Sequence, residues 1–232
     1  MANWFLGRAL AEEAETENAA WSFLGEGAAF WVTVAVLLVV GVAVYLVTRK
    51  KSSKKSFWTA KTMAVGAMCM ALSSVLSLIK LWSMPMGGSV TPASMLPLLL
   101  FAYCYGVGPG MVLGALYGVM QFVLDGGAWA ALGLIPNLLD YPIAFAMTGL
   151  AGCFRGSKAK MAAGFVLACF GRFASSFLSG VFFYASSAPE GVNPVWYSLT
   201  YNGSYMLVEC IICIALGLLV GERLAKELKK VA

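Results

Sequence analysis

The chain has 232 residues, of which 60% are hydrophobic and only 12% are charged. Soluble domains carry charged side chains at about a quarter of their positions, so this composition indicates an integral membrane protein. The chain contains no histidine, which excludes catalytic Ser-His and Cys-His pairs and histidine-ligated zinc. At about 20 residues per spanning helix, the length accommodates six or seven helices with short loops and leaves no room for a soluble catalytic domain.

The N-terminal part of the chain has the pattern of a membrane anchor. Residues 1–28 carry five glutamates and one arginine, and we expect them to form an acidic extracellular tail. The apolar segment 29–48 predicts an accessory transmembrane helix, and the basic segment 49–57 predicts a cytoplasmic linker. A cleaved signal peptide would place its basic segment before the apolar one, so this order indicates an anchor whose N-terminus lies outside.

Six more spans are predicted after this anchor, within a membrane domain that covers residues 58–222. Their ranges are 60–80, 94–106, 109–125, 132–153, 162–185 and 200–221. If these spans cross the membrane in alternating directions, starting from the cytoplasm, thirteen of the sixteen Lys and Arg residues lie inside, in agreement with the positive-inside rule. The basic tail 223–232 then lies in the cytoplasm. The sequence therefore predicts an all-α membrane protein with a six-helix core and one extra N-terminal transmembrane helix.

The predicted outer loops, 81–93, 126–131 and 186–199, are rich in turn formers and aromatic residues and carry little positive charge. Tryptophans at such positions are typical of the aromatic belt at a membrane interface. The alternative is a lidded pocket that opens to the outside, and the polar residues of the last three spans favour this second interpretation.

Charged side chains inside the predicted spans need an explanation, because each costs about 2.5 to 3.5 kcal/mol on insertion scales and usually faces a cavity or a partner. The residues concerned are Asp125, Asp140, Arg172 and Glu209. Pairing of Arg172 with an acid such as Glu209 would hold helices together without any ligand. Asp140 is flanked by an asparagine, Tyr141 and Pro142, a proline that frees a backbone carbonyl, so we favour a binding role there.

The last two spans add polar and aromatic side chains at helical spacing. These are Ser175, Ser176, Ser179, Tyr184, Tyr197, Tyr201, Asn202, Ser204 and Tyr205. Serines that pack helices and an interfacial tyrosine belt explain part of this set, but not the amide of Asn202. An acid, an amide and several rings suit a small, flat, cationic heteroaromatic ligand, because the rings attract the cation and the polar groups pair with its nitrogens.

Other kinds of site are disfavoured. The P-loop motif of ATP hydrolysis is absent, so the energy for any transport would come from partners or ion gradients. All six cysteines lie in or beside apolar runs, and no disulfide, metal site or catalytic residue is predicted. The first core span carries a face of small residues, made of Ala60, Ala64, Ala67 and Ala71. Such a face lets another helix dock closely, although packing within the protein is its commoner use.

Three motifs occur in order along the core. They are Leu81-Trp-Ser-Met-Pro-Met-Gly-Gly-Ser-Val90, Leu139-Asp-Tyr-Pro-Ile-Ala-Phe145, and the stretch from Arg172 to Glu209 with Ser179-Gly-Val-Phe-Phe, Ala188-Pro-Glu-Gly191 and Tyr197-Ser-Leu-Thr-Tyr-Asn-Gly-Ser-Tyr205. In this order and spacing, over about residues 57–225, the chain resembles the thiamine-binding substrate-specificity (S) component of energy-coupling factor (ECF) transporters. The N-terminal tail and the accessory helix lie outside the resemblance.

The resemblance implies a protein of the bacterial cell membrane that captures thiamine from outside with high affinity for ATP-driven uptake. The implied partners are thiamine, a transmembrane coupling subunit, two cytoplasmic ATPase subunits and the lipid bilayer, with no nucleic acid and no cofactor. The protein itself would not be an enzyme. In this family the S component is thought to topple in the membrane and to dock through small-residue motifs on its first helix, which the alanine face matches in position.

When the family's ligand-binding residues are transferred to the matching motifs of this chain, the resemblance implies the ligand residues Trp82, Asp140, Tyr141, Ser176, Tyr184, Tyr197 and Asn202. Trp82 is the loosest match. Ser176 stands where the family has a histidine and Tyr184 where it has a stacking tryptophan, but each keeps a hydrogen-bonding group or a ring. Asp140 stands where the family usually has a glutamate, so its shorter carboxylate must approach from a displaced backbone or through a water.

These departures keep other interpretations open. The ligand of the same transporter role could be a thiamine relative such as the hydroxymethyl-aminopyrimidine moiety. A structural membrane protein without a ligand, whose polar residues only pack helices, is a second class. An intramembrane hydrolase is a third class and is disfavoured, because its serine would need an activating base and the chain has no histidine.

Overall fold

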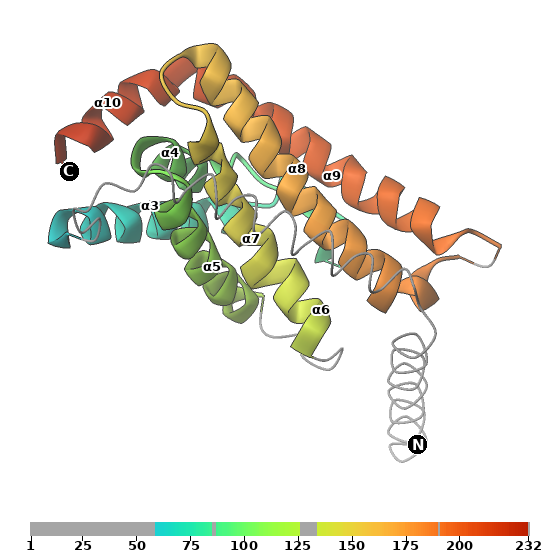
Figure 1. The fold of residues 1–232 in the computed structure, drawn as a ribbon. Coiled ribbons are helices and arrows are strands. Elements are labelled where there is room, and N and C mark those ends of the chain that lie inside the picture. The colour runs from blue at the N-terminus through green and yellow to red at the C-terminus, as the bar shows by residue number, and fades with distance from the viewer. Residues whose placement is uncertain (1–58, 85–86, 126–133, 190, 232) are drawn as a thin grey trace. The chain divides into compact units, whose positions relative to one another are not determined.

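The structure, a computed structural model, describes residues 59–84, 87–125, 134–189 and 191–231 (Figure 1). The chain divides into two compact units, 1–55 and 56–232, and the described residues all belong to the second. The predicted acidic tail, accessory helix and basic linker lie outside the described residues.

Helices dominate the described part of the chain. The α-helices are α3 (Ala60–Leu78), α4 (Leu96–Tyr105), α5 (Val107–Leu124), α6 (Leu134–Leu138), α7 (Ala144–Ala146), α8 (Lys158–Phe183), α9 (Pro194–Leu216) and α10 (Glu222–Val231). Two π-helices, η3 (Leu139–Ile143) and η6 (Gly217–Gly221), and two 3-10 helices, η4 (Met147–Cys153) and η5 (Ala185–Ser187), lie between them. Two short strands, β1 (Trp82–Ser83) and β2 (Ser89–Val90), pair antiparallel in the loop before α4.

The all-α membrane class predicted from the sequence is confirmed. Within the described residues four stretches are long and apolar enough to cross a membrane, namely α3, α5, α8 and the continuous run 194–228 through α9 and α10. Each overlaps a predicted span. The number of crossings and the extra N-terminal helix stay predictions.

The helix α9 begins earlier than the sequence pattern suggested. It starts at Pro194, inside the predicted outer loop 186–199, because Asn193 caps it: the side-chain oxygen accepts a hydrogen bond from the backbone N–H of Val195 at 2.8 Å. Proline in the first turn costs no hydrogen bond, since that N–H has no partner within the helix. Both start signals were present in the sequence, and the predicted boundary at residue 200 was wrong.

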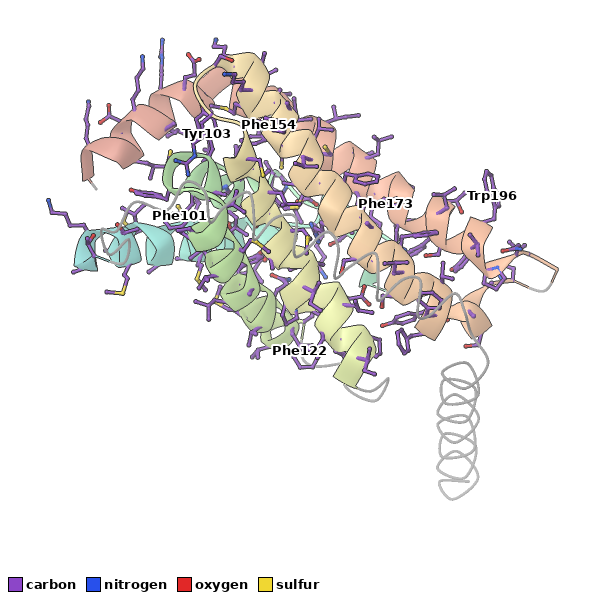
Figure 2. All side chains as sticks on the ribbon, viewed as in Figure 1. Phe101, Tyr103, Phe122, Phe154, Phe173 and Trp196 are labelled. Carbon is purple, nitrogen blue, oxygen red and sulfur yellow. The ribbon has the colours of Figure 1, made fainter. Side chains whose placement is uncertain are left out.

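The short helix α4 is the centre of the described bundle. Its sequence is apolar on every face, and residues 96–104 are all buried, including Phe101 at 0% exposure (Figure 2). Neighbours on several sides cover it, among them α3, α5, α8, α10 and η4. An all-apolar helix is stable in this position because no side needs to face water.

The predicted span 132–153 is an irregular helix. It passes from α6 through the π-helical turn η3 to α7 and the 3-10 helix η4. Pro142 lies inside η3 and has no backbone N–H to donate, so the regular hydrogen-bond ladder is interrupted there. In Figure 1 this broken helix lies beside α5, and α8 and α9 run next to each other as a pair.

Glycines on α5 allow the broken helix to approach closely. Gly110, Gly114 and Gly118 recur every four residues and therefore share one face of α5. A Cβ atom at Gly114 would overlap the backbone oxygen of Phe145, and one at Gly118 would overlap that of Tyr141. These backbone contacts leave no room for a side chain and fix the π-helical turn against α5.

The two basic clusters of the described domain lie at the same end of the bundle. The start of α8 is next to η6, since a Cβ atom at Gly221 would lie only 3.0 Å from Met161 Sδ. Lys158 and Lys160 on α8 therefore lie at the same end as the basic helix α10 (Figure 1). The predicted membrane topology requires both clusters to lie at one end. That this end faces the cytoplasm stays a prediction.

Substitution of Gly114 by alanine should destabilise the domain. The added Cβ meets a backbone oxygen that cannot rotate away, and we expect a loss of about 1 to 3 kcal/mol in the free energy of unfolding. Gly108→Ala on the same helix is the matched control, because nothing lies within 4 Å of its Cβ position. Thermal unfolding in detergent compares them. Equal melting temperatures for both variants would contradict the close packing of α5.

Candidate functional site

A cavity of about 150 Å³ lies between the loop that holds β1 and β2, α5, the broken helix, α8 and α9. Its charged lining residues are Asp125, Asp140, Arg172 and Glu209. Its tyrosines are Tyr117, Tyr141, Tyr184, Tyr197, Tyr201 and Tyr205. All four charged residues that the sequence placed in the spans therefore line one cavity, which offers three carboxyl groups and one guanidinium.

The π-helical turn η3 positions Asp140. Successive side chains of an α-helix diverge by about 100°, yet Asp140 and Tyr141 both line the cavity from this wider turn. The Ser179 hydroxyl donates a hydrogen bond to Asp140 Oδ2 at 2.7 Å, and the Ser175 hydroxyl donates to the carbonyl of Leu139 at 2.6 Å. These two serines fasten α8 to the π-helical turn and orient the carboxyl group.

A row of tyrosines on α9 forms an aromatic wall. Tyr197 and Tyr201 are stacked with ring centroids 5.9 Å apart, and Tyr201 meets Tyr205 edge to face at 5.9 Å. The backbone N–H of Gly88 donates a hydrogen bond to the Tyr201 hydroxyl at 3.0 Å. A Cβ atom at Gly88 would lie 2.8 Å from that oxygen, so glycine is required for the loop to approach the wall.

The amide of Asn202 joins α9 to α8. Its nitrogen donates to the carbonyl and hydroxyl of Ser198 at 3.1 and 3.2 Å and to the carbonyl of Ser176 at 3.4 Å. Its oxygen accepts from the Tyr205 hydroxyl at 3.1 Å. Gly180 permits this approach, because a Cβ atom there would overlap Ser198 Oγ. The amide is therefore held in one orientation at the cavity wall.

A chain of hydrogen bonds fixes the α5 side of the cavity. The Tyr141 hydroxyl donates to Asp125 Oδ2 at 3.1 Å, and Asp125 Oδ1 accepts from the Gln121 amide at 3.3 Å. The Tyr117 hydroxyl in turn donates to Gln121 Oε1 at 3.0 Å. The Tyr141 ring also meets Phe122 edge to face, with centroids 5.3 Å apart; Figure 2 labels Phe122 on α5.

A second polar cluster ties the segment after β2 to α9. Glu209 is 2% exposed, and its Oε1 accepts hydrogen bonds from the hydroxyls of Thr91 at 2.7 Å and Ser94 at 2.9 Å. Because these hydroxyls precede α4, the Glu209 carboxyl group connects the start of the central helix to the cavity wall.

Arg172 has different partners from those that the sequence suggested. Its Nη1 lies 2.7 Å from Met95 Sδ, and its guanidinium carbon lies 4.2 Å above the centre of the Phe145 ring. It makes no ion pair with an acid in the described residues, where the ion pair found is Lys230–Glu227 on α10. Direct pairing of Arg172 with Glu209 to hold helices is therefore not observed.

Six of the seven predicted ligand residues line the cavity, namely Asp140, Tyr141, Ser176, Tyr184, Tyr197 and Asn202. The seventh, Trp82, lies in β1 with its side chain 51% exposed and does not line the cavity. The turn between the strands places Gly87 and Gly88 there instead. Ligand contact by all seven residues stays a prediction.

Sequence reasoning missed several lining residues, including Thr91, Ser94, Tyr117 and Gln121. One signal was available on α5: Tyr117, Gln121 and Asp125 recur every four residues, which puts three polar groups on one face of an apolar helix. Thr91 and Ser94 belong to a loop whose path could not be read from periodicity.

The alanine face of α3 points away from the described bundle. Its residues Ala60, Ala64, Ala67 and Ala71 are all exposed, whereas the opposite face, with Val65 and Cys69, is buried. The face therefore does not serve packing within the described part of the chain. A role in docking a partner stays a prediction.

Comparison with known proteins identifies relatives of this chain. A family model described as "Thiamine transporter protein (Thia_YuaJ)" matches residues 63–228. The thiamine transporter ThiT of Bacillus subtilis is 41% identical over 145 residues, which cover 56% of this chain and 73% of that protein. ThiT of Lacticaseibacillus paracasei is 30% identical over 134 residues, 52% of this chain and 67% of that protein.

A solved structure has a similar fold. The structure of ThiT from Listeria monocytogenes superposes with a TM-score of 0.63 and covers 72% of this chain and 96% of that one. At 19% sequence identity this similarity concerns the fold alone.

Replacement of Glu209 by alanine should destabilise the unliganded protein. The variant leaves the buried hydroxyls of Thr91 and Ser94 without their acceptor, and we expect a loss of about 2 kcal/mol in the free energy of unfolding. Glu209→Gln is the matched control, because it keeps an acceptor oxygen and should lose less. Thermal unfolding in detergent measures both. If Glu209→Ala is as stable as the parent, the carboxyl group does not hold the start of α4.

Proposed function

The chain belongs to the thiamine transporter family, and from this membership we propose that its cavity binds thiamine with high affinity as the substrate-binding subunit of an ATP-driven ECF transporter. The protein is a membrane-embedded transporter rather than an enzyme. Its implied place is the bacterial cell membrane, with the N-terminus outside and the C-terminus in the cytoplasm.

The proposal rests on the charged groups and aromatic rings that line the cavity. Three carboxyl groups face one guanidinium there, and six tyrosines surround them. Thiamine is a permanent cation built from two flat heteroaromatic rings, so a lining with excess acid and many aromatic faces suits it. An anionic or aliphatic ligand would gain little from this lining.

Asp140 is the acid that we assign to the ligand. The Ser179 hydroxyl donates to Asp140 Oδ2 at 2.7 Å, and the side chains of Ser176 and Tyr184, two other predicted ligand residues, also hydrogen-bond to this carboxyl group. Asp140 lies on the same cavity as the stacked rings of Tyr197 and Tyr201. A carboxylate oxygen beside aromatic faces is suited to an exocyclic amine or to the cationic ring.

The proposal also concerns the energy source of transport and the partner subunits. We assign ATP hydrolysis to two cytoplasmic ATPase subunits, joined to this chain by a transmembrane coupling subunit. The exposed alanine face of α3 supports such docking, because small side chains let the backbones of two helices come close in a membrane.

A thiamine precursor is the second candidate ligand. Ser176 and Tyr184, both on the cavity wall, are smaller than the family's histidine and tryptophan. The hydroxymethyl-aminopyrimidine moiety keeps the ring and the amine but lacks the thiazolium cation. Calorimetric titration with both compounds distinguishes them: tighter binding of thiamine supports the first candidate, and tighter binding of the pyrimidine moiety supports the second.

Asp140→Asn should weaken thiamine binding by about tenfold to a hundredfold, because a hydrogen bond to a charged group contributes about 1.5 to 3 kcal/mol. The measurement is calorimetric titration of the purified protein in detergent. The matched control is Glu222→Gln on α10, the same change of an acid to its amide at a position that does not line the cavity. Unchanged affinity in Asp140→Asn would remove Asp140 from the ligand site.

Ala64→Leu should abolish uptake and spare binding. The larger side chain keeps a partner helix away from α3, while the cavity on the other side of that helix is untouched. Cells that depend on this protein for thiamine should lose most of the uptake of labelled vitamin, and the purified variant should bind it normally. Ala163→Leu, at an exposed alanine of α8, should retain uptake. Normal uptake in Ala64→Leu would exclude this docking face.

A further inference from the structure

Arg172 lines the ligand cavity with a guanidinium that is poorly supplied with hydrogen-bond acceptors. A guanidinium carries five N–H donors. The Nε of Arg172 is buried and has no hydrogen-bond partner among the described residues. Its Nη1 donates to Met95 Sδ, a thioether and therefore a weak acceptor, and the guanidinium lies over the Phe145 ring. A sulfur and a ring thus stand where a guanidinium usually has oxygen acceptors.

The acids of the cavity do not supply these acceptors. Asp125, Asp140 and Glu209 all accept hydrogen bonds from uncharged side chains, and within the described part of the chain none of them forms an ion pair with Arg172. A charged group inside a spanning helix is costly unless it has a partner. Because Arg172 lines the cavity and is not paired with a neighbouring acid, we expect its partner in the cavity, on the ligand.

The position of Arg172 on α8 relates it to Asp140. Arg172 precedes Ser176 by four residues and Ser179 by seven, so the three share one face of α8, at about 6 and 10 Å along the helix. Both serines hydrogen-bond to the Asp140 carboxyl group. The contact of Arg172 on the other side, Met95, is 1% exposed and directly precedes the central helix α4. A ligand bound at Asp140 therefore has the guanidinium one to two helical turns further toward the core.

We propose that Arg172 is a specificity-determining residue, which binds an oxygen acceptor at the end of the ligand while Asp140 binds its amine or its cationic ring. This inference rests on the proposed function, since it concerns how the same cavity selects its ligand. Thiamine carries such an oxygen on the hydroxyethyl arm of its cationic ring, and a phosphate ester of thiamine carries oxyanions there. A guanidinium binds both kinds of oxygen through its N–H donors.

The charge of Arg172 gives the proposal a definite sign. A cation in the cavity repels a cationic ligand, so loss of the charge alone should strengthen thiamine binding. Loss of hydrogen bonds from the guanidinium to the ligand's oxygen should instead weaken thiamine binding, by about tenfold or more. A residue that only holds the cavity in shape should change the binding of all similar ligands alike. The direction of the change and its dependence on the oxygen therefore separate the three roles.

The test is calorimetric titration of the purified protein with three ligands: thiamine, thiamine monophosphate, and the analogue whose thiazolium ring carries a methyl group in place of the hydroxyethyl arm. Arg172→Met removes the donors and keeps an apolar stem against Phe145. It should bind thiamine about tenfold more weakly than the parent does and bind the methyl analogue equally or more tightly. A larger loss for the monophosphate than for thiamine identifies an oxyanion as the preferred acceptor, and a larger loss for thiamine identifies the hydroxyl.

Two further variants keep the test decisive. Arg172→Lys keeps the charge but lacks Nε–H and the planar fork, so it should also lower the ratio of thiamine to methyl-analogue affinity, even if Arg172→Met does not fold. The matched control is Arg223→Met, the same change at an exposed arginine of α10 that does not line the cavity, and it should leave all three affinities unchanged.

Two results would overturn the assignment of Arg172. Stronger binding of thiamine by Arg172→Met would leave the residue with a charge effect alone, and an equal loss for thiamine and the methyl analogue would leave it with a structural role. Failure of the proposed function is a separate result, because the parent protein would then bind none of the three ligands.

Discussion

The membrane interior offers no water to a buried polar group, and the described fold depends on how the chain satisfies such groups from within. Asp140 is bonded by Ser179 across two helices, and Glu209 by Thr91 and Ser94 across a helix and a loop. In each case the partner comes from another element. The hydrogen bonds that make it possible to bury these acids therefore also join the elements that enclose the cavity.

The need to satisfy buried polar groups from within the protein also explains why the irregular helix lies against α5 and carries Asp140. A π-helical turn around Pro142 moves the backbone that carries Asp140, and α5 accepts the irregular turn because its glycines leave backbone in contact with backbone. An aspartate is one methylene shorter than the glutamate usual in this family, and a displaced backbone is one of the two ways in which its carboxylate can reach a ligand. The local irregularity and the shorter acid are thus compatible parts of one site.

Much of this arrangement could be predicted from the sequence. Apolar runs predicted the long helices, and the cost of burying a charge singled out Asp125, Asp140, Arg172 and Glu209 as residues that face either a cavity or a partner. The partners of Arg172 could not be predicted, because Met95 and Phe145 are distant in sequence and neither sulfur nor ring is marked as a partner of a cation. The path of the loop around Trp82 could not be predicted for a related reason: a loop has no periodicity, so the turn that brings Gly88 rather than Trp82 to the cavity wall appears only in three dimensions.

The central helix α4 connects the cavity to the basic helix α10. At one end, Ser94 and Met95 contact the cavity residues Glu209 and Arg172; at the other, Tyr105 is bonded to α10. A ten-residue helix is about 15 Å long, so a shift at its start reaches α10 over a short, fully packed path. Coupling between the cavity and α10 would require an element with two discrete arrangements, one of which the ligand favours. The contact of α10 with α4 is the best placed for this, because it depends on few hydrogen bonds and joins a polar surface helix to an apolar core.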